Sequence, residues 1–270
     1  QGTIPTVTLP FNTPSDFIPI PEAMHLQGNN LIDLIQAIYF DIARNSAADP
    51  QYFVGRAILT AKNKDVSTIN DLLLRCLPDR KVSYFSHDCV CEPQNALALQ
   101  VEYLNSIETG SLPPHILELK IGAPIMVIRN IDPAAGVCNG TRLIVRSLGT
   151  NTIEATIATG PKAGNIVHIP RIKIICSASD GKSPYDFARV QFPVRLAFAM
   201  TINKAQGQTL DSIGLYLPSH VFGHGQLYVA MSRVRTPSSI KLLIEPEISQ
   251  IPGRNGFYTH NIVFEEVFNQ

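Results

Sequence analysis

The 270-residue sequence lacks an excess of charge of either sign, because 22 Lys and Arg balance 22 Asp and Glu. It therefore lacks the global positive field that often accompanies nucleic-acid binding. A protein that contacts few phosphates can still concentrate its positive charge in one channel, so this absence weakens that class without excluding it. The sequence also has no apolar run of the roughly 18 residues that a membrane helix needs, and we expect no membrane partner.

Cysteine is scarce as well. Five cysteines, an odd number, argue against a disulfide framework and for a reducing compartment. His87, Cys89 and Cys91 lie close together in sequence, but no second Cys or His pair follows at the spacing of a structural zinc site. We therefore predict reduced cysteines near a strand and no metal ligands among these residues.

A phosphate-binding P-loop is missing too. Its pattern G-x-x-x-x-G-K-[ST] lets backbone N–H groups approach the phosphates while the lysine neutralises them. The nearest string is Gly181-Lys182-Ser183, but Cys176 occupies the position of the first glycine. Polar residues before this string and Pro184 after it indicate a surface turn. No strand end rich in aspartate and suited to Mg²⁺ stands out, so we expect both features upstream of Gln1.

Hydrophobic residues make up 45% of the sequence, which indicates a folded chain with room for one large or two small domains. Apolar residues three and four apart predict a helix over 31–40. A short apolar run predicts a strand over 57–60, then a polar loop and a helix over 66–77 that ends before Pro78. Strand, loop and helix in this order form an α/β unit, whose loops at the carboxyl ends of the strands build ligand crevices.

Between about Pro113 and Phe192 the pattern becomes β-rich. Short strands are predicted over 125–128, 142–145, 152–157, 166–169 and 172–175, with turn signals between them. We therefore predict an α/β domain of residues 1–112 and 193–270, interrupted by a small β-barrel of residues 113–192. A helix over 262–268 is expected to close the chain.

A polar cluster follows an apolar run over 195–200, which predicts a buried parallel strand. Gly207 permits a positive φ or a close backbone approach. Gln206 supplies hydrogen-bond donors, and Lys204 supplies a point charge suited to a phosphate. The alternative is an ordinary polar loop whose lysine meets only solvent.

A second pattern lies over 226–235, where a helix would place Leu227, Ala230, Met231 and Val234 on an inward stripe. Gln226 and Arg233, seven positions apart, would share another face of that helix. Arg235 would lie about 200° from Arg233, so the two arginines would not reach one phosphate. We predict Arg233 as the functional arginine, inside the helix; the alternative is a surface ion pair with a carboxylate.

These strings resemble conserved motifs of the petite-integration-frequency helicases, a 5′-to-3′ branch of superfamily 1. Residues 201–210 resemble motif V and residues 228–235 resemble motif VI, while residues 56–63 are similar to the motif IV region. Residues 117–126 and 138–145 resemble the opening of the Src-homology-3-like barrel of these proteins. Residues 191–198 are similar to members carried by Helitron transposons. The blocks follow in order from about Ile18 to Leu243.

The resemblance implies an α/β fold, the second RecA-like motor domain with the inserted barrel. It implies that Arg233 contacts the γ-phosphate of ATP, and that Gln206 and Gly207 link the nucleotide to the grip on DNA. It implies a single-stranded DNA track formed by Thr60, Asn63, Thr201, Asn203 and Lys204. Many relatives carry His at the position of Asn203. An asparagine side chain can still form hydrogen bonds there, but it has no group that titrates.

We therefore predict the C-terminal half of an ATP- and Mg²⁺-dependent DNA helicase. Its partners would be single-stranded DNA, duplex junctions and a missing N-terminal RecA-like domain that binds most of the ATP and Mg²⁺. The chain alone is expected neither to hydrolyse ATP nor to unwind DNA. The resemblance implies a nuclear location, with the mitochondrion as the alternative, and a role in repair, recombination, telomere maintenance or Helitron transposition. The rival hypotheses are a non-enzymatic single-strand-binding remnant of a transposon helicase and a scaffold domain.

Overall fold

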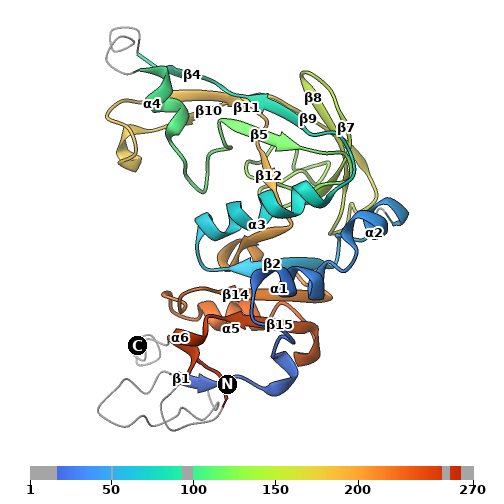
Figure 1. Cartoon of the computed structure of the whole chain (residues 1–270). Coiled ribbons are helices and arrows are strands. Elements are labelled where there is room, and N and C mark those ends of the chain that lie inside the picture. Colours follow the sequence, from blue (N-terminus) through green and yellow to red (C-terminus); the bar gives the residue numbers. More distant parts are fainter. Residues whose placement is uncertain (1–16, 50, 93–99, 251–255, 263–270) are drawn as a thin grey trace. The chain divides into compact units, whose positions relative to one another are not determined.

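The computed structural model describes residues 17–49, 51–92, 100–250 and 256–262 (Figure 1). The chain forms two compact units. The first combines residues 1–45, 55–71 and 198–270, and the second combines residues 46–54 and 72–197. Helices α2 (Ile42–Ala48) and α3 (Asn63–Cys76) run across positions at which the chain passes from one unit to the other.

The first unit is built on a parallel sheet with the strand order β13-β2-β14-β15. Its strands are β2 (Arg56–Thr60), β13 (Ala199–Thr201), β14 (Ser212–Leu217) and β15 (Ile240–Ile244). Helix α1 (Leu31–Ile38) packs on this sheet (Figure 1). A Cβ on Gly214 would lie 3.0 Å from Ile38 and 3.2 Å from Leu34, so the missing side chain lets the helix approach the strand closely.

The remaining elements of the first unit surround this sheet. They are β1 (Phe17–Pro19), η1 (Glu22–Met24), η4 (Ile202–Ala205), α5 (Gln226–Met231), η5 (Pro237–Ser239), α6 (Pro246–Ser249) and β16 (Tyr258–His260). Strands β1 and β16 pair antiparallel and bring together two segments from opposite ends of the sequence. In the described part of the chain, no helix is long and apolar enough to cross a membrane.

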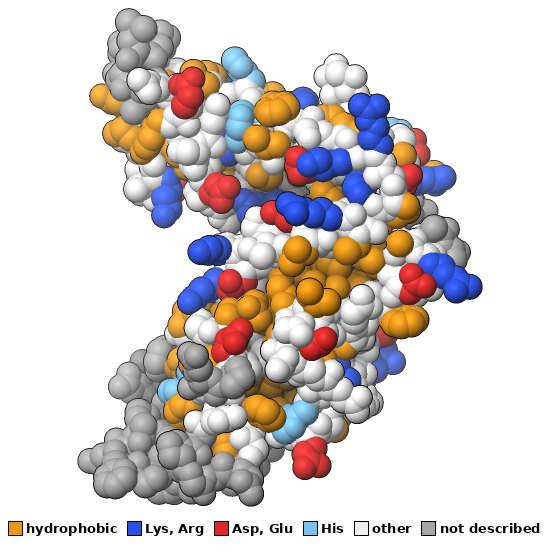
Figure 2. Space-filling view, viewed as in Figure 1, with side chains coloured by type: hydrophobic (Ala, Val, Ile, Leu, Met, Phe, Trp, Pro, Cys, Tyr) orange, Lys and Arg blue, Asp and Glu red, His pale blue; other side chains and the backbone are white. Residues whose placement is uncertain are grey.

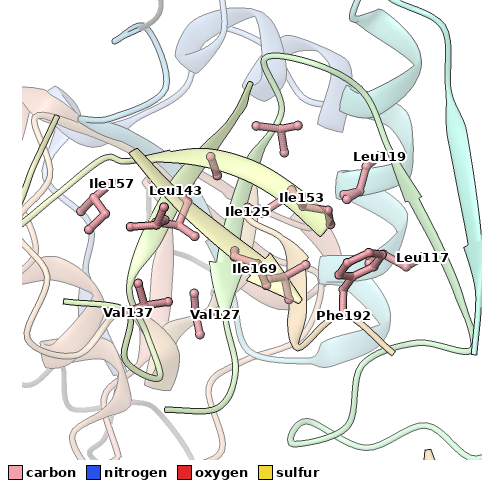
Figure 3. Packing of buried hydrophobic residues seen from close by; sticks show 14 of the residues in the cluster. Leu117, Leu119, Ile125, Val127, Val137, Leu143, Ile153, Ile157, Ile169 and Phe192 are labelled. Atoms are coloured by element: carbon pink, nitrogen blue, oxygen red, sulfur yellow. The ribbon is translucent and has the colours of Figure 1, made fainter. Parts of the chain in front are cut away.

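The second unit contains an antiparallel sheet of five strands in the order β12-β6-β7-β8-β9. These strands are β6 (Pro124–Val127), β7 (Arg142–Leu148), β8 (Thr152–Ile157), β9 (Ile166–Pro170) and β12 (Val194–Leu196). Alternate residues of β8 are buried, as expected for a strand with one face on a core. Figure 3 shows this core, in which Ile125, Leu143, Ile153 and Ile169 point inward from neighbouring strands.

Two further sheets complete the second unit. They contain β3 (Val82–Phe85), β4 (His87–Val90), β5 (Ile116–Leu119), β10 (Ile172–Cys176) and β11 (Phe187–Gln191), with α4 (Val101–Ser106) and η3 (Ala178–Asp180) beside them. Strand β3 pairs with β5, and β11 lies between β10 and β4. The second unit therefore extends beyond the predicted insert of residues 113–192, because strands upstream of Pro113 form hydrogen bonds within it.

A buried ion pair explains why these upstream residues belong to the second unit. Arg189 and Asp88 are both fully buried, with 2.6 Å between the Arg189 Nη2 and the Asp88 Oδ2. The same guanidinium donates to the backbone carbonyls of Leu104, Ile107 and Pro113. A buried charge is costly unless it is paired and hydrogen-bonded, so these contacts tie β11, β4 and the α4 segment together.

Most predicted elements are confirmed. Each of the five β-rich runs contains a strand, and the strand predicted over 57–60 is β2. The helix predicted over 31–40 ends at Ile38, and the helix predicted over 66–77 begins earlier, at Asn63. The helix predicted over 262–268 lies almost entirely outside the described residues.

One predicted strand was wrong. The apolar run 195–200 is not a single parallel strand but is divided between β12 and β13. Strand β12 pairs antiparallel with β6, whereas β13 pairs parallel with β2. The buried residues Ala197 and Phe198 join the two strands into one apolar run, and hydrophobicity alone does not distinguish one strand from two.

Candidate functional site

The candidate site lies at the carboxyl ends of the parallel strands of the first unit. The register aligns Thr201 of β13 with Thr60 of β2, and Thr60 with Tyr216 of β14. Three hydroxyl side chains therefore stand side by side at one edge of the sheet. This is the edge at which open α/β sheets bind their ligands.

The charge at this edge is uneven. Burial raises the pKa of the Tyr216 phenol, and the carboxylates of Glu245 and Asp65 raise it further. Lys204, by contrast, follows β13 at the other side of the same edge. Carboxylates therefore lie near Tyr216 of β14, and a lysine follows β13.

The loop after β13 forms the 3₁₀ helix η4, which is anchored by the buried side chains of Ile202 and Ala205. Between these anchors Asn203 is exposed and Lys204 is half-buried, and Gln206, which follows Ala205, is exposed. The backbone of Gly207 has a φ of +81°, a conformation that glycine adopts readily. The alternating burial gives this loop a fixed backbone and a solvent-facing polar rim.

The sequence predicted Arg233 inside a helix, but this was wrong, because Arg233 lies beyond the end of the helix. Helix α5 ends at Met231, and the Arg233 side chain folds back on the helix end, where its Nε donates to the Val229 carbonyl at 2.8 Å. Its Nη1 donates to the Gln208 carbonyl at 3.1 Å, and the Leu210 N–H donates to the Arg233 carbonyl at 2.8 Å. The predicted motif V and motif VI segments are therefore in direct contact.

Gln226 also differs from the prediction that it shares a helix face with Arg233, because Arg233 lies beyond the end of α5. Its side chain is buried, and its Oε1 accepts hydrogen bonds from the N–H groups of Phe222 and Gly223 at 3.1 and 3.2 Å. Gln226 thus stabilises the turn before α5. This role leaves its side chain directed at the protein backbone.

Thr60 and Asn63 were predicted together as DNA contacts, but the structure places them differently. Thr60 is 0% exposed, and its Oγ1 has no hydrogen-bond partner in the described part of the chain. Asn63 is exposed at the first residue of α3. A buried hydroxyl cannot touch DNA in this conformation, whereas the exposed Asn63 side chain is accessible.

Sequence reasoning did not single out Asn70 as a site residue. Asn70 lies on α3 and is buried, and its side chain forms two hydrogen bonds with the backbone of Ala199. Its signal in the sequence was a polar residue within the apolar stripe of a helix that follows a strand. Such a residue needs partners when it is buried.

The string Gly181-Lys182-Ser183 forms a closed turn, as predicted. Gly181 ends η3 with a φ of 68°, and the Ser183 hydroxyl donates to the Tyr185 carbonyl at 2.8 Å. No cluster of three or more His, Cys, Asp or Glu able to hold a metal occurs among the residues that the structure describes. Cys89 and Cys91 are exposed, reduced cysteines at strand β4.

Comparisons with known proteins agree with this architecture. Residues 102–148 match the family described as DNA helicase Pif1, 2B domain. The chain is 29% identical over 225 residues to the ATP-dependent DNA helicase PIF1 of Homo sapiens, which is 78% of this chain and 32% of that relative. The chain thus spans about a third of the length of this curated relative.

Comparison with solved structures also finds Pif1 helicases. The crystal structure of Bacteroides Pif1 bound to single-stranded DNA is 26% identical with a TM-score of 0.51, covering 72% of this chain and 41% of that chain. A Bacteroides Pif1 complex with ADP-AlF3 and single-stranded DNA has a TM-score of 0.54 at 21% identity, covering 87% and 52% of the two chains. At this identity, the second match supports the fold alone.

Together, the parallel sheet with its strand-end loops and these matches show a mixed α/β fold similar to that of Pif1 helicase structures, and residues 102–148 match the 2B domain of that family. More narrowly, the proteins that this chain is similar to are Pif1-family helicases, of which it matches a part. The curated members of this family are ATP-dependent DNA helicases. The Src-homology-3-like form of the barrel stays a prediction.

Proposed function

We propose that this chain is the C-terminal motor half of a 5′-to-3′ ATP-dependent DNA helicase. The contact between Arg233 and the loop after β13 carries this proposal. A guanidinium that senses the γ-phosphate would shift the same backbone that carries Asn203 and Lys204. Nucleotide state and DNA grip would then be coupled through Gln208, one residue beyond Gly207.

Arg233 is suited to contact a phosphate. A guanidinium has five N–H donors, and Arg233 uses three in hydrogen bonds to Val229, Gln208 and Ser232 among the described residues. Donors therefore remain for an oxygen of the γ-phosphate, held by a side chain whose direction is already fixed. The Gly207 N–H and the exposed side-chain amide of Gln206 would add polar contacts.

The DNA track would follow the rim formed by Asn63, Thr201, Asn203 and Lys204. Lys204 supplies the positive charge for a phosphate, and the amides supply hydrogen bonds. The buried Thr60 would support this rim from below. Its hydroxyl would form a hydrogen bond with Thr201 or a backbone group when the loop moves. On the face in Figure 2, positive and negative side chains are interspersed, so this grip must be local.

ATP and Mg²⁺ would be bound mainly by an N-terminal RecA-like domain. The residues of this chain fit the outer phosphate of ATP, because Arg233 supplies a cation there. They do not fit Mg²⁺, which prefers several carboxylate and water ligands, because no group of metal-binding side chains lies in the described residues. Bound Mg²⁺ would neutralise charge on the phosphates, and Arg233 would stabilise the charge that develops in the transition state.

Single-stranded DNA and duplex junctions are the proposed nucleic-acid partners. We also propose a nuclear protein, with the mitochondrion as the alternative. Repair, recombination, telomere maintenance and Helitron transposition would all use the same site.

The first test measures ATP hydrolysis by the 270-residue chain, with and without single-stranded DNA. We expect no hydrolysis above background, because the P-loop is missing. Addition of a P-loop domain from a relative, fused upstream, should produce hydrolysis that DNA stimulates. Clear hydrolysis by the chain alone would contradict the proposal and point to the turn at Gly181.

The second test measures binding of a fluorescent oligonucleotide of about 16 nucleotides. We expect the affinity to fall steeply between about 50 and 200 mM salt. Lys204→Ala should lower the affinity for the oligonucleotide and reduce its dependence on salt. Lys182 lies in the turn at Gly181, and Lys182→Ala should change neither the affinity nor its salt dependence. Binding that never couples to hydrolysis in the fusion would instead favour a DNA-binding remnant.

A further inference from the structure

We infer that Asn70 is the positioning residue that fixes the DNA-contacting loop to helix α3, an inference that rests on the proposed function. Asn70 is 5% exposed and lies on the face of α3 that also buries Ile69 and Leu73. It is a polar residue in an apolar layer, so its amide must be satisfied inside the protein.

Both ends of the Asn70 amide bind one residue, Ala199. The Ala199 N–H donates to the Asn70 Oδ1 at 2.8 Å, and the Asn70 Nδ2 donates to the Ala199 carbonyl at 3.1 Å. The two residues are 129 positions apart in sequence. This pair of bonds reproduces the contact that a neighbouring strand would make.

The geometry of the parallel sheet explains this arrangement. Strand β13 is an edge strand, with β2 on its inner side. The Phe198 carbonyl points inward and accepts from the Ile58 N–H at 3.0 Å. The polar groups of the next residue, Ala199, point the other way, to the open edge. Asn70 closes this edge two residues before Thr201, where the polar loop begins.

Asn70 also connects the two sides of the proposed DNA rim. Asn63 lies seven residues earlier on the same helix, about two turns away. Thr201 lies two residues after Ala199 on the strand that Asn70 holds. The amide therefore sets the distance between the first residue of α3 and the loop that carries Asn203 and Lys204. We expect it to govern DNA affinity rather than phosphate chemistry.

The main test compares Asn70→Leu with a matched control, Gln191→Leu. The Gln191 side chain is buried in the second unit and also bonds backbone groups, those of Tyr84, His115 and Phe192. Both variants should lower the melting temperature. At a temperature where all the proteins are folded by circular dichroism, only Asn70→Leu should weaken oligonucleotide binding, by about tenfold.

Hydrogen exchange gives a second measurement that does not depend on DNA. In Asn70→Leu, amides over 199–207 should exchange faster than in the wild type, while those of β8 keep their rates. Equal DNA affinity and equal exchange over 199–207 in wild type and Asn70→Leu would overturn the inference. If the wild-type chain binds no DNA, the proposed function fails, and the exchange experiment still decides whether Asn70 positions the loop.

Asn70→Asp provides a variant with a conditional defect. A buried carboxylate beside the Ala199 carbonyl has a raised pKa, because burial and the carbonyl oxygen both disfavour the charge. Its protonated form can again accept from and donate to Ala199. We expect its DNA affinity, relative to wild type at each pH, to be reduced at about pH 8 and restored at about pH 5. A defect that does not decrease on acidification would contradict this role.

Discussion

Replacement of Arg233 by alanine, compared with the same change at Arg235, separates a structural contribution from a catalytic one. Arg233 is half-buried and donates to the Val229 and Gln208 carbonyls and to the Ser232 hydroxyl. Arg235 is exposed. Hydrogen bonds from a charged group contribute up to about 1.5–3 kcal/mol each when buried, and much less when solvent competes. We therefore expect Arg233→Ala to lower the free energy of unfolding by about 1–2 kcal/mol.

The catalytic effect should be larger than this structural one. An arginine that contacts the transferred phosphate is worth about 10³–10⁵ in rate, or about 4–7 kcal/mol. In a fusion of this chain with a P-loop domain, Arg233→Ala should therefore lower the rate of ATP hydrolysis by at least about 10³-fold. The rate is measured at a temperature where the variant remains folded. Binding of ATP should remain largely intact.

The assay is steady-state hydrolysis of ATP with saturating DNA, beside urea unfolding of each variant. Arg235→Ala should stay within about 0.5 kcal/mol of wild type in stability and retain hydrolysis. Arg233→Lys keeps the charge but loses the planar fork of donors, and should recover little activity. A turnover of Arg233→Ala within tenfold of wild type would refute the assignment.

Three further predictions concern the rest of the chain. Arg189→Met should lower the free energy of unfolding by about 3–5 kcal/mol in urea titrations, because Asp88 is left as a buried, unpaired charge. Burial, and then the charge of His260, lowers the pKa of His220, so its neutral form is preferred in the folded state. Stability should therefore be full above about pH 6.5 and be lost as pH falls through the folded-state pKa, an effect that His220→Phe should reduce in melting experiments. Burial and Asp180 raise the pKa of the Cys176 thiol, so thiol reagents should label it far more slowly than the exposed Cys89.

Matched controls make these predictions decisive. Lys81→Met removes an exposed ion pair with Glu118 and should cost at most about 1 kcal/mol. Equal losses for Arg189→Met and Lys81→Met would contradict the buried-pair argument. An unaltered pH dependence in His220→Phe, or labelling of Cys176 as fast as that of Cys89, would contradict the other two.

Much of the fold could be predicted from the sequence where the pattern is local. The five β-rich runs alternate or are bounded by turn signals, and each contains a strand. Gly207 was expected to permit a positive φ or a close backbone approach, and its φ is positive. The family resemblance rested on ordered strings rather than on periodicity, and the comparisons agree with it.

The extent of the second unit could not be predicted, because it depends on contacts distant in sequence. Arg189 binds Asp88 across 101 positions and Leu104 across 85. In the sequence, Asp88 stands between exposed His87 and Cys89 and looks like one more polar residue of a surface strand. Only the pairing of β4 with β11 turns its side chain to the interior.

The position of Arg233 shows the same limit at the candidate site. Periodicity favoured a helix through the arginine, but Gly225 starts α5 in a left-handed conformation and the helix has only six residues. A helix this short is not stable by itself, so its end is set by what it packs against, here η4. The Leu210 N–H binds the Arg233 carbonyl and the Arg233 guanidinium binds the Gln208 carbonyl, so the loop itself ends the helix. The contact that makes Arg233 a candidate for coupling is therefore also the reason that the sequence pattern misplaced it.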